Sequence, residues 1–152
     1  MGSKSDLSHG EAIADALSRF GIDSEIRVAS AHKAPAFVLD LLNAYEADPR
    51  PKVYVTVAGR SNALSGLVDG SVAAPVIACP PYSDKFDGSD IYSSLRMPSG
   101  IAPAVVLEPA GAALLAAKIL GLGDEEIADA VGEAQRAATQ TIIDDDQALR
   151  AE

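Results

Sequence analysis

The chain has 152 residues, of which 48% are apolar, and a formal net charge of −10 at pH 7. This length and apolar content suit one folded domain, which we expect to span residues 1–152. Proteins that bind nucleic acid gather Lys and Arg into basic patches, so this acidic chain is not expected to bind nucleic acid. No apolar run approaches the roughly 20 residues that cross a bilayer, so we expect no membrane contact and a cytoplasmic location.

Cysteine and histidine are scarce, with one cysteine and two histidines in the whole chain. Cys79 therefore cannot form an internal disulfide, and its position after an apolar run predicts a buried structural residue. With so few Cys and His side chains, a metal site is not expected. We interpret His9, at a predicted helix start without a charged partner, as a surface residue.

The first half of the chain alternates helical and extended patterns. Apolar residues recur at helical spacing in two stretches, and two other stretches are short and rich in β-formers. The expected elements are a helix from Ser8 or His9 to about Phe20, a strand over 24–29, a helix opened by Pro35 and broken by Pro49 and Pro51, and a strand over 52–58.

The second half continues the same alternation. Its expected elements are a helix over 63–71, a strand over 75–78, a short helix over 91–95, a strand over 104–107, a helix over 109–120, and a last helix that Asp124 caps and that runs to about Ile143. Alternating short strands and helices predict an α/β fold with right-handed crossovers: a doubly wound parallel sheet between two layers of helices.

Ligands bind beyond the carboxyl ends of the strands in such sheets. Three small, polar loops should meet there: 2–6, 30–33 and 59–62. Gly and Ser before a helix offer free N–H and hydroxyl groups, which suit a phosphate. Asp6 suits a ribose hydroxyl instead. The fingerprints of dinucleotide binding, of nucleoside triphosphate binding and of serine hydrolases are all absent.

The second loop holds a histidine beside a fixed cation. His32 can exchange a proton near neutral pH while Lys33 holds an anion. The same residues are equally compatible with an ordinary solvated loop, because most charges in loops are simply hydrated.

Five segments together resemble the 5-aminoimidazole ribonucleotide (AIR) carboxylase family of purine biosynthesis, in particular class II, which uses carbon dioxide directly. The resemblance covers nearly the whole chain. Its motifs are Met1-Gly-Ser-Lys-Ser-Asp6, Ser30-Ala-His-Lys-Ala-Pro35, Val57-Ala-Gly-Arg-Ser-Asn62, Cys79-Pro-Pro81 and Ser93-Ser-Leu-Arg-Met-Pro-Ser-Gly100.

The resemblance implies a role for each loop. Ser3, Ser30 and Lys33 would hold the 5′-phosphate with the backbone of Gly2, and Asp6 would bind the ribose. A ring carbon of AIR would attack CO2, and His32 would then remove the proton from that carbon. No metal or organic cofactor is implied. The CO2 site would comprise Gly59, Arg60, Ser61 and Asn62, and Ser5 and Ala31 complete the predicted substrate-binding set.

Two alternatives stay open. The mutase branch of the same family rearranges carboxyaminoimidazole ribonucleotide and typically has Arg after the histidine and a Gly-Gly-x-Ala-His-Leu-Pro-Gly loop. Lys33 and Arg60-Ser61-Asn62 resemble the direct carboxylase instead. A non-catalytic module that senses a ribonucleotide phosphate would need Ser3, Asp6 and Lys33 but not His32.

The family is octameric, so the resemblance implies a homo-octamer. The helix over 110–120 and the last helix would provide much of the subunit contact, although the first of these could equally pack inside one subunit. Asp90 and Arg96 could reach the site from a neighbouring loop or subunit, or could form surface salt bridges.

Family members carry an apolar strand directly before the Gly-Ser-x-Ser-Asp loop, whereas Met1 opens this sequence. The resemblance implies a flavodoxin-like order for the three-layer α/β fold, with that strand inside the sheet, where its loss would leave two neighbours with unpaired backbone groups. We therefore expect either a recorded start that is too late or a rearranged or gapped sheet. Residues 1–152 by themselves are expected to fold poorly.

Overall fold

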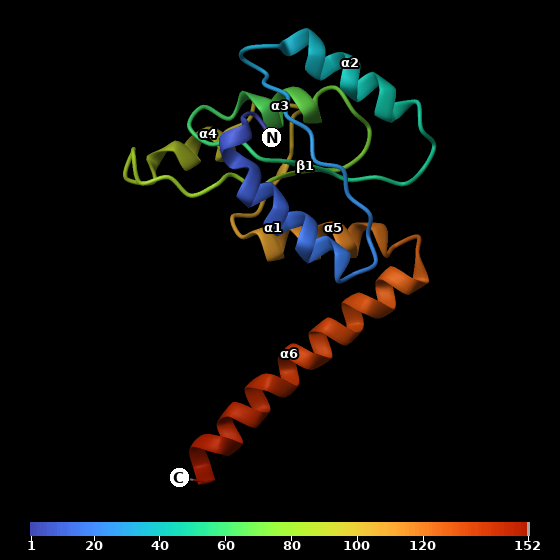
Figure 1. Ribbon diagram of the computed structural model, residues 1–152, viewed down its shortest axis with the longest axis vertical. Coiled ribbons are helices and arrows are strands. Elements are labelled where there is room, and N and C mark those ends of the chain that lie inside the picture. The colour runs from blue at the N-terminus through green and yellow to red at the C-terminus, as the bar shows by residue number, and fades with distance from the viewer. Residues whose placement is uncertain (152) are drawn as a thin grey trace.

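The computed structural model describes residues 1–151. Strands and helices alternate in the middle of the chain, and two successive helices stand at each end (Figure 1). In chain order they are the 3-10 turn η1 (Lys4–Asp6), α1 (Leu7–Ser18), α2 (Pro35–Glu46), β1 (Tyr54–Thr56), α3 (Ala63–Asp69), β2 (Val76–Ala78), η2 (Ser89–Ile91), α4 (Tyr92–Leu95), β3 (Ala104–Val105), α5 (Pro109–Leu120) and α6 (Glu125–Ala151).

The three strands form one parallel sheet in the order β1-β2-β3. Val55 lies opposite Ile77, and Ile77 lies opposite Ala104, so β2 is the central strand. The predicted α/β fold with a parallel sheet is confirmed. The strands are shorter than the β-rich runs in the sequence, because only part of each run pairs with a neighbouring strand.

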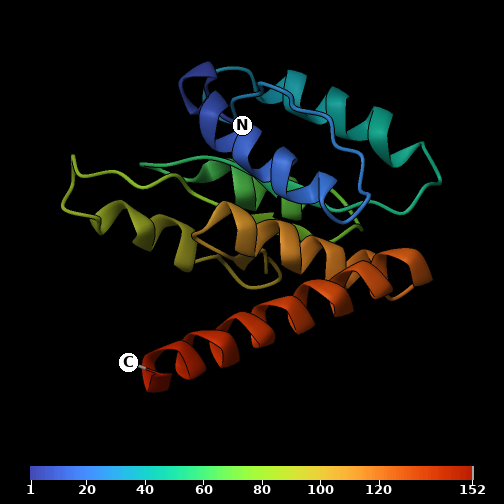
Figure 2. The ribbon, with the colours of Figure 1, turned by 60° about the horizontal axis from the view of Figure 1, so that its bottom comes forward.

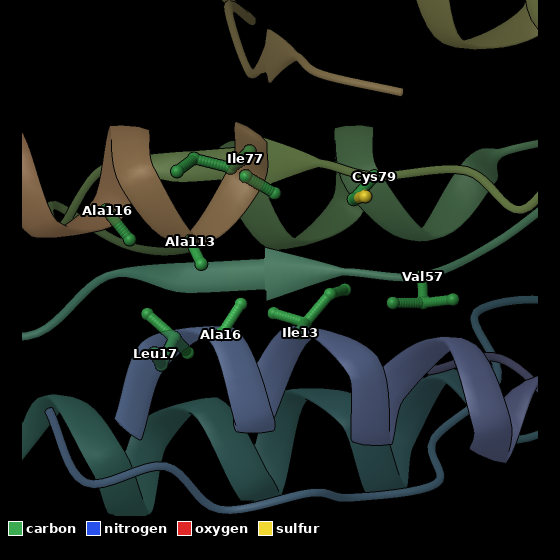
Figure 3. Close-up of a cluster of buried hydrophobic side chains, with 9 residues drawn as sticks. Ile13, Ala16, Leu17, Val57, Ile77, Cys79, Ala113 and Ala116 are labelled. Carbon is green, nitrogen blue, oxygen red and sulfur yellow. The ribbon is translucent and has the colours of Figure 1, made fainter. Parts of the chain in front are cut away.

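Helices cover both faces of this sheet, which confirms the three-layer arrangement (Figure 1). Successive side chains of a strand point to opposite faces. Accordingly, Ile77 packs with α1 and α5, whereas the adjacent Val76 packs with α2 and α3. Figure 3 shows the first of these cores, in which Ile13 and Leu17 of α1 gather with alanines of α5.

The segment 24–29 is extended but forms no strand, so the prediction of a strand there was wrong. A cavity of about 1160 Å³ lies along it, lined by this segment on one side and by Tyr54 to Val57 on the other. Among residues 1–151, Met1 alone forms backbone hydrogen bonds with it: Ala29 N–H donates to the Met1 carbonyl (2.8 Å), and the Met1 amine donates to the Arg27 carbonyl (2.8 Å). The sheet is therefore gapped, one of the arrangements expected above.

The last helix runs eight residues beyond the predicted end, because the structure ends α6 at Ala151 rather than near Ile143. Side-chain pairs one turn apart support the extension: the Gln140 amide donates to Asp144 (2.7 Å), and Arg150 lies 3.6 Å from Asp146. Figure 2 shows α5 between α6 and the sheet, and α6 projects away from the body of the molecule in Figure 1.

Candidate active site

The three predicted loops are brought together by backbone hydrogen bonds around Met1 and Gly2. Gly2 N–H donates to the carbonyl oxygen of Val57 (2.9 Å), which places the first loop beside the end of β1. Ala29 N–H donates to the Met1 carbonyl (2.8 Å), which places the start of the second loop on the other side of Met1. The first loop thus lies between the other two at the carboxyl edge of the sheet.

The first loop is shaped by its own hydroxyl groups. Ser3 caps η1, because its Oγ accepts from the Ser5 N–H at 3.2 Å. The Ser5 hydroxyl donates to Ser3 Oγ (2.8 Å) and lies 3.3 Å from a carboxylate oxygen of Asp6. Ser3 and Asp6 are half-buried and Ser5 is exposed. These side chains form one polar cluster that a phosphate and a ribose could contact.

The second loop is a tight turn that leads into α2. The Lys33 N–H donates to Ser30 Oγ (3.3 Å), and the Ala34 N–H donates to the Ser30 carbonyl (2.9 Å). His32 and Lys33 are exposed at the tip of this turn, whereas Ala29 before it is buried. A buried anchor with two exposed titratable side chains suits a loop that contacts ligand.

The third loop turns sharply at Arg60, whose φ of +58° lies in the left-handed region. Asn62 is buried, with 4% of its surface exposed, and caps α3 by accepting from the Ser65 N–H (3.1 Å). Arg60 and Ser61 are exposed. The loop therefore presents Arg60 and Ser61 to solvent on a fixed base.

The side-chain charges of Lys33 and Arg60 form no salt bridge within residues 1–151. Among residues 1–151, the salt bridges join Arg27 to Glu25, Arg50 to Asp48 and Arg150 to Asp146. Lys33 and Arg60 take part in none of these. In a chain of net charge −10, these two side chains are the cations at this sheet edge that an anionic ligand could pair with.

The contact between His9 and Cys79 differs from the sequence prediction. His9 was expected on the surface, but it is half-buried and its Nε2 lies 3.3 Å from Cys79 Sγ. The helix start turns this side chain inward over the end of β2. Cys79 is fully buried, as predicted. Burial raises the pKa of the Cys79 thiol to about 11, and the Glu108 carboxylate contributes further.

The structure also bears on the sequence expectations about a metal site and about membrane contact. Within residues 1–151, no group of three or more His, Cys, Asp or Glu side chains is placed so that it could hold a metal ion. No helix in that part of the chain combines the length and the apolarity needed to cross a membrane.

Comparison with known proteins now gives the family. The model of the AIR carboxylase family matches residues 1–141. The chain belongs to the AIR carboxylase family. It is 59% identical over 150 residues to a phosphoribosylaminoimidazole carboxylase of Treponema denticola, covering 99% of this chain and 94% of that protein.

Other relatives span a wide range of organisms. A phosphoribosylaminoimidazole carboxylase of Archaeoglobus fulgidus is 54% identical over 99% of this chain and 82% of its own length. The bifunctional phosphoribosylaminoimidazole carboxylase/phosphoribosylaminoimidazole succinocarboxamide synthetase of Homo sapiens is 49% identical over 82% of this chain and 29% of its own length. The crystal structure of Treponema denticola PurE has a TM-score of 0.96 and 60% identity, covering 98% of this chain and 94% of that one. The AIR carboxylase fold is therefore shown for this chain.

Sequence reasoning understated one part of the site. Asp90 accepts a hydrogen bond from the Arg60 N–H (3.0 Å), so it reaches the third loop from within the same chain. Ser93 and Ser94 also contact this loop, although the sequence offered no signal for them beyond their place in a family motif. Arg96 is exposed. The roles of the other predicted site residues stay predictions.

Proposed function

We propose that this member of the AIR carboxylase family carboxylates AIR with CO2 to give 4-carboxy-5-aminoimidazole ribonucleotide. The observation that carries the proposal is the meeting of loops 2–6, 30–33 and 59–62 at one sheet edge through Met1 and Gly2. The first two loops offer the polar groups that suit a ribose phosphate. The third offers a second, adjacent subsite for a small co-substrate.

In this proposal the 5′-phosphate lies on Ser3, Ser30 and Lys33, and Asp6 binds the ribose. Lys33 is suited to the phosphate because it is exposed and belongs to no salt bridge of the described chain. A phosphate paired with an ammonium group forms charge-assisted hydrogen bonds, which are about twice as strong as neutral ones. The Gly2 N–H is already bonded to Val57, so Gly2 contributes close approach rather than a free donor.

The chemical step forms one carbon–carbon bond and moves one proton. The enamine-like ring carbon of AIR attacks the carbon of CO2, and one C=O electron pair moves to oxygen to give the carboxylate. His32 accepts the proton left on the ring carbon, which restores the aromatic ring. A histidine suits this step because its unperturbed pKa lies near the working pH. Holding the two small reactants in place can contribute about 7–11 kcal/mol in favourable cases.

The direct carboxylase is favoured over the mutase branch by Lys33 and by Arg60-Ser61-Asn62, the residues that resemble class II. The names of the full-length relatives support the same choice, since the Treponema denticola and Archaeoglobus fulgidus proteins are both named as carboxylases. A non-catalytic module that senses a ribonucleotide phosphate is a weaker alternative, because such a module would not need His32.

We also propose a homo-octamer in the cytoplasm. Along α6, Ile142, Ile143 and Leu149 are 69%, 43% and 74% exposed, more apolar surface than a solitary helix needs to show. The alanines of α5, in contrast, pack inside the subunit against α1. Subunit contact should therefore come from α6 more than from α5. Mass determination by light scattering tests this, with eight subunits expected and a monomer contradicting it.

Replacement of His32 by Asn tests the proposed chemistry. The variant should still bind AIR, because the phosphate and ribose contacts remain, but labelled bicarbonate should no longer enter product. Because His32 is exposed, imidazole added to a His32→Gly variant should partly restore turnover, with wild type plus imidazole as the control. Unchanged turnover by His32→Asn would contradict the enzyme proposal.

A further inference from the structure

The segment 90–94 holds the third loop by four hydrogen bonds that cross about 30 positions of sequence. A carboxylate oxygen of Asp90 accepts from the Arg60 N–H at 3.0 Å. The Ser93 hydroxyl donates to the Arg60 carbonyl (2.7 Å) and accepts from the Asn62 N–H (3.0 Å). The Asn62 amide donates to Ser94 Oγ (2.8 Å). Both ends of the Arg60–Asn62 stretch are therefore fixed by one neighbouring segment.

Arg60 needs such support because of its backbone. Arg60 is a non-glycine residue with a positive φ of 58°, a strained backbone conformation that persists where the surroundings over-determine it. Asp90 and Ser93 bind the N–H and the carbonyl of this same residue. They therefore hold the strained residue Arg60 through its N–H on one side and its carbonyl on the other.

The same contacts determine which backbone N–H groups of the loop lack a hydrogen-bond acceptor. The N–H groups of Arg60 and Asn62 are taken by Asp90 and Ser93. The N–H of Ser61 between them has no acceptor within residues 1–151, and Ser61 is exposed. The N–H of exposed Ser61 is therefore available to an oxygen of CO2 or of the nascent carboxylate.

We propose that Asp90 and Ser93 are positioning residues for the carboxylation, which set the shape of the Arg60–Asn62 loop so that it binds CO2 beside the ring carbon of AIR. This inference rests on the proposed function. Neither residue needs to touch AIR. Loss of either hydrogen bond lets the loop relax away from the left-handed turn at Arg60, so the affinity for CO2 falls while the affinity for AIR stays.

Two matched residues elsewhere make similar hydrogen bonds without touching the loop. Asp69 accepts from the Ala102 N–H at 2.7 Å, a carboxylate-to-backbone bond that spans 33 positions. The Ser71 hydroxyl donates to the Leu67 carbonyl at 2.6 Å. Their alanine variants remove the same kinds of contact, so they report what a purely structural role would do.

The experiment compares Asp90→Ala and Ser93→Ala with Asp69→Ala and Ser71→Ala in the intact enzyme. The KM for CO2 is measured with bicarbonate and carbonic anhydrase, the AIR dissociation constant by calorimetry and the midpoint of unfolding by circular dichroism. The first pair should raise the KM for CO2 about tenfold or more, since small displacements of a positioning group can cost far more than that. The AIR dissociation constant should change less than about twofold, because a group that does not touch AIR removes no part of its binding.

Conservative variants test whether the hydrogen bonds of Asp90 and Ser93 are sufficient for their effect. Asp90→Asn keeps an oxygen that can accept from the Arg60 N–H, and Ser93→Thr keeps the hydroxyl, so both should have a KM for CO2 near that of wild type. Should Asp90→Ala fail to fold, Ser93→Ala and its rescue by Ser93→Thr decide the question.

Outcomes that defeat the inference differ from those that defeat the proposed function. A wild type that does not carboxylate AIR removes the proposed function. An active wild type whose Asp90 and Ser93 variants change the KM for CO2 no more than the Asp69 and Ser71 variants would overturn the inference alone.

Discussion

The N–H of Gly2 lies 2.9 Å from the carbonyl oxygen of Val57, two residues before the Gly59–Asn62 loop begins. Met1 extends this contact to the second loop through its carbonyl, which accepts from Ala29 N–H (2.8 Å). Met1 and Gly2 therefore bridge the two sides of the gapped sheet and set the spacing between the proposed phosphate subsite and the proposed CO2 subsite.

Met1 and Gly2 are the two residues that link segment 24–29 to β1, so we expect this region to limit the stability of the fold. The groove between 24–29 and β1 has a volume of about 1160 Å³ and is lined by apolar side chains from both cores, including Ile13, Leu42 and Val57. We expect residues 1–152 to unfold in a broad, low-temperature transition. An added segment of about five apolar β-formers ahead of Met1 should pair with both rims and raise the midpoint by several degrees.

A Gly-Ser segment of equal length is the control for that addition, because it lengthens the chain without filling the groove. Thermal melts followed by circular dichroism compare the three proteins. A cooperative melt of residues 1–152, with no gain in midpoint from the apolar segment over the Gly-Ser segment, would contradict the expectation.

The Cys79 thiol should make stability depend on alkaline pH. Burial raises its pKa to about 11 from a usual value of 9.0, so the folded protein keeps this proton where the unfolded chain loses it. The contribution is fully present below pH 9 and is lost as pH rises toward 11. Urea melts at pH 8 and pH 10.5 should show a fall in unfolding free energy that is smaller in Cys79→Ala. Equal falls in the two proteins would show that Cys79 does not cause the dependence.

Lys33 should matter for AIR and not for CO2. Lys33→Gln removes the proposed phosphate partner, so the KM for AIR should rise about 10- to 100-fold, in line with hydrogen bonds to charged groups. The dependence of that KM on salt should weaken as well. Lys118→Gln, which removes an exposed charge on α5, is the matched control. A KM for AIR that is the same in both variants would exclude Lys33 from the phosphate subsite.

Local patterns predicted the parts of the fold that depend on local chemistry. Pro35 and Pro109 start helices in the structure as the sequence indicated, because proline suits the first turn of a helix. The strand over 24–29 could not be judged locally, since a strand exists only where a neighbour pairs with it. The sequence pattern of those residues is strand-like, but in the described part of the chain Met1 alone pairs with them.

In the site, too, local sequence patterns predicted some features, whereas others depend on tertiary contacts. Gly, Ser, His and Lys at the ends of predicted strands marked the three loops, because parallel strands bring their carboxyl ends to one edge. The contacts of Ser93 with Arg60 and Asn62 join positions more than 30 residues apart, and the contact of His9 with Cys79 joins positions 70 apart. Such pairs depend on how layers pack, which no local pattern reports.

The central claim is that the enzyme uses CO2 directly. It is tested by supplying AIR with bicarbonate and carbonic anhydrase in one reaction and carboxyaminoimidazole ribonucleotide alone in another, and by following formation of 4-carboxy-5-aminoimidazole ribonucleotide. The account predicts product from the first reaction and not from the second. Product from the second reaction and not from the first would contradict it.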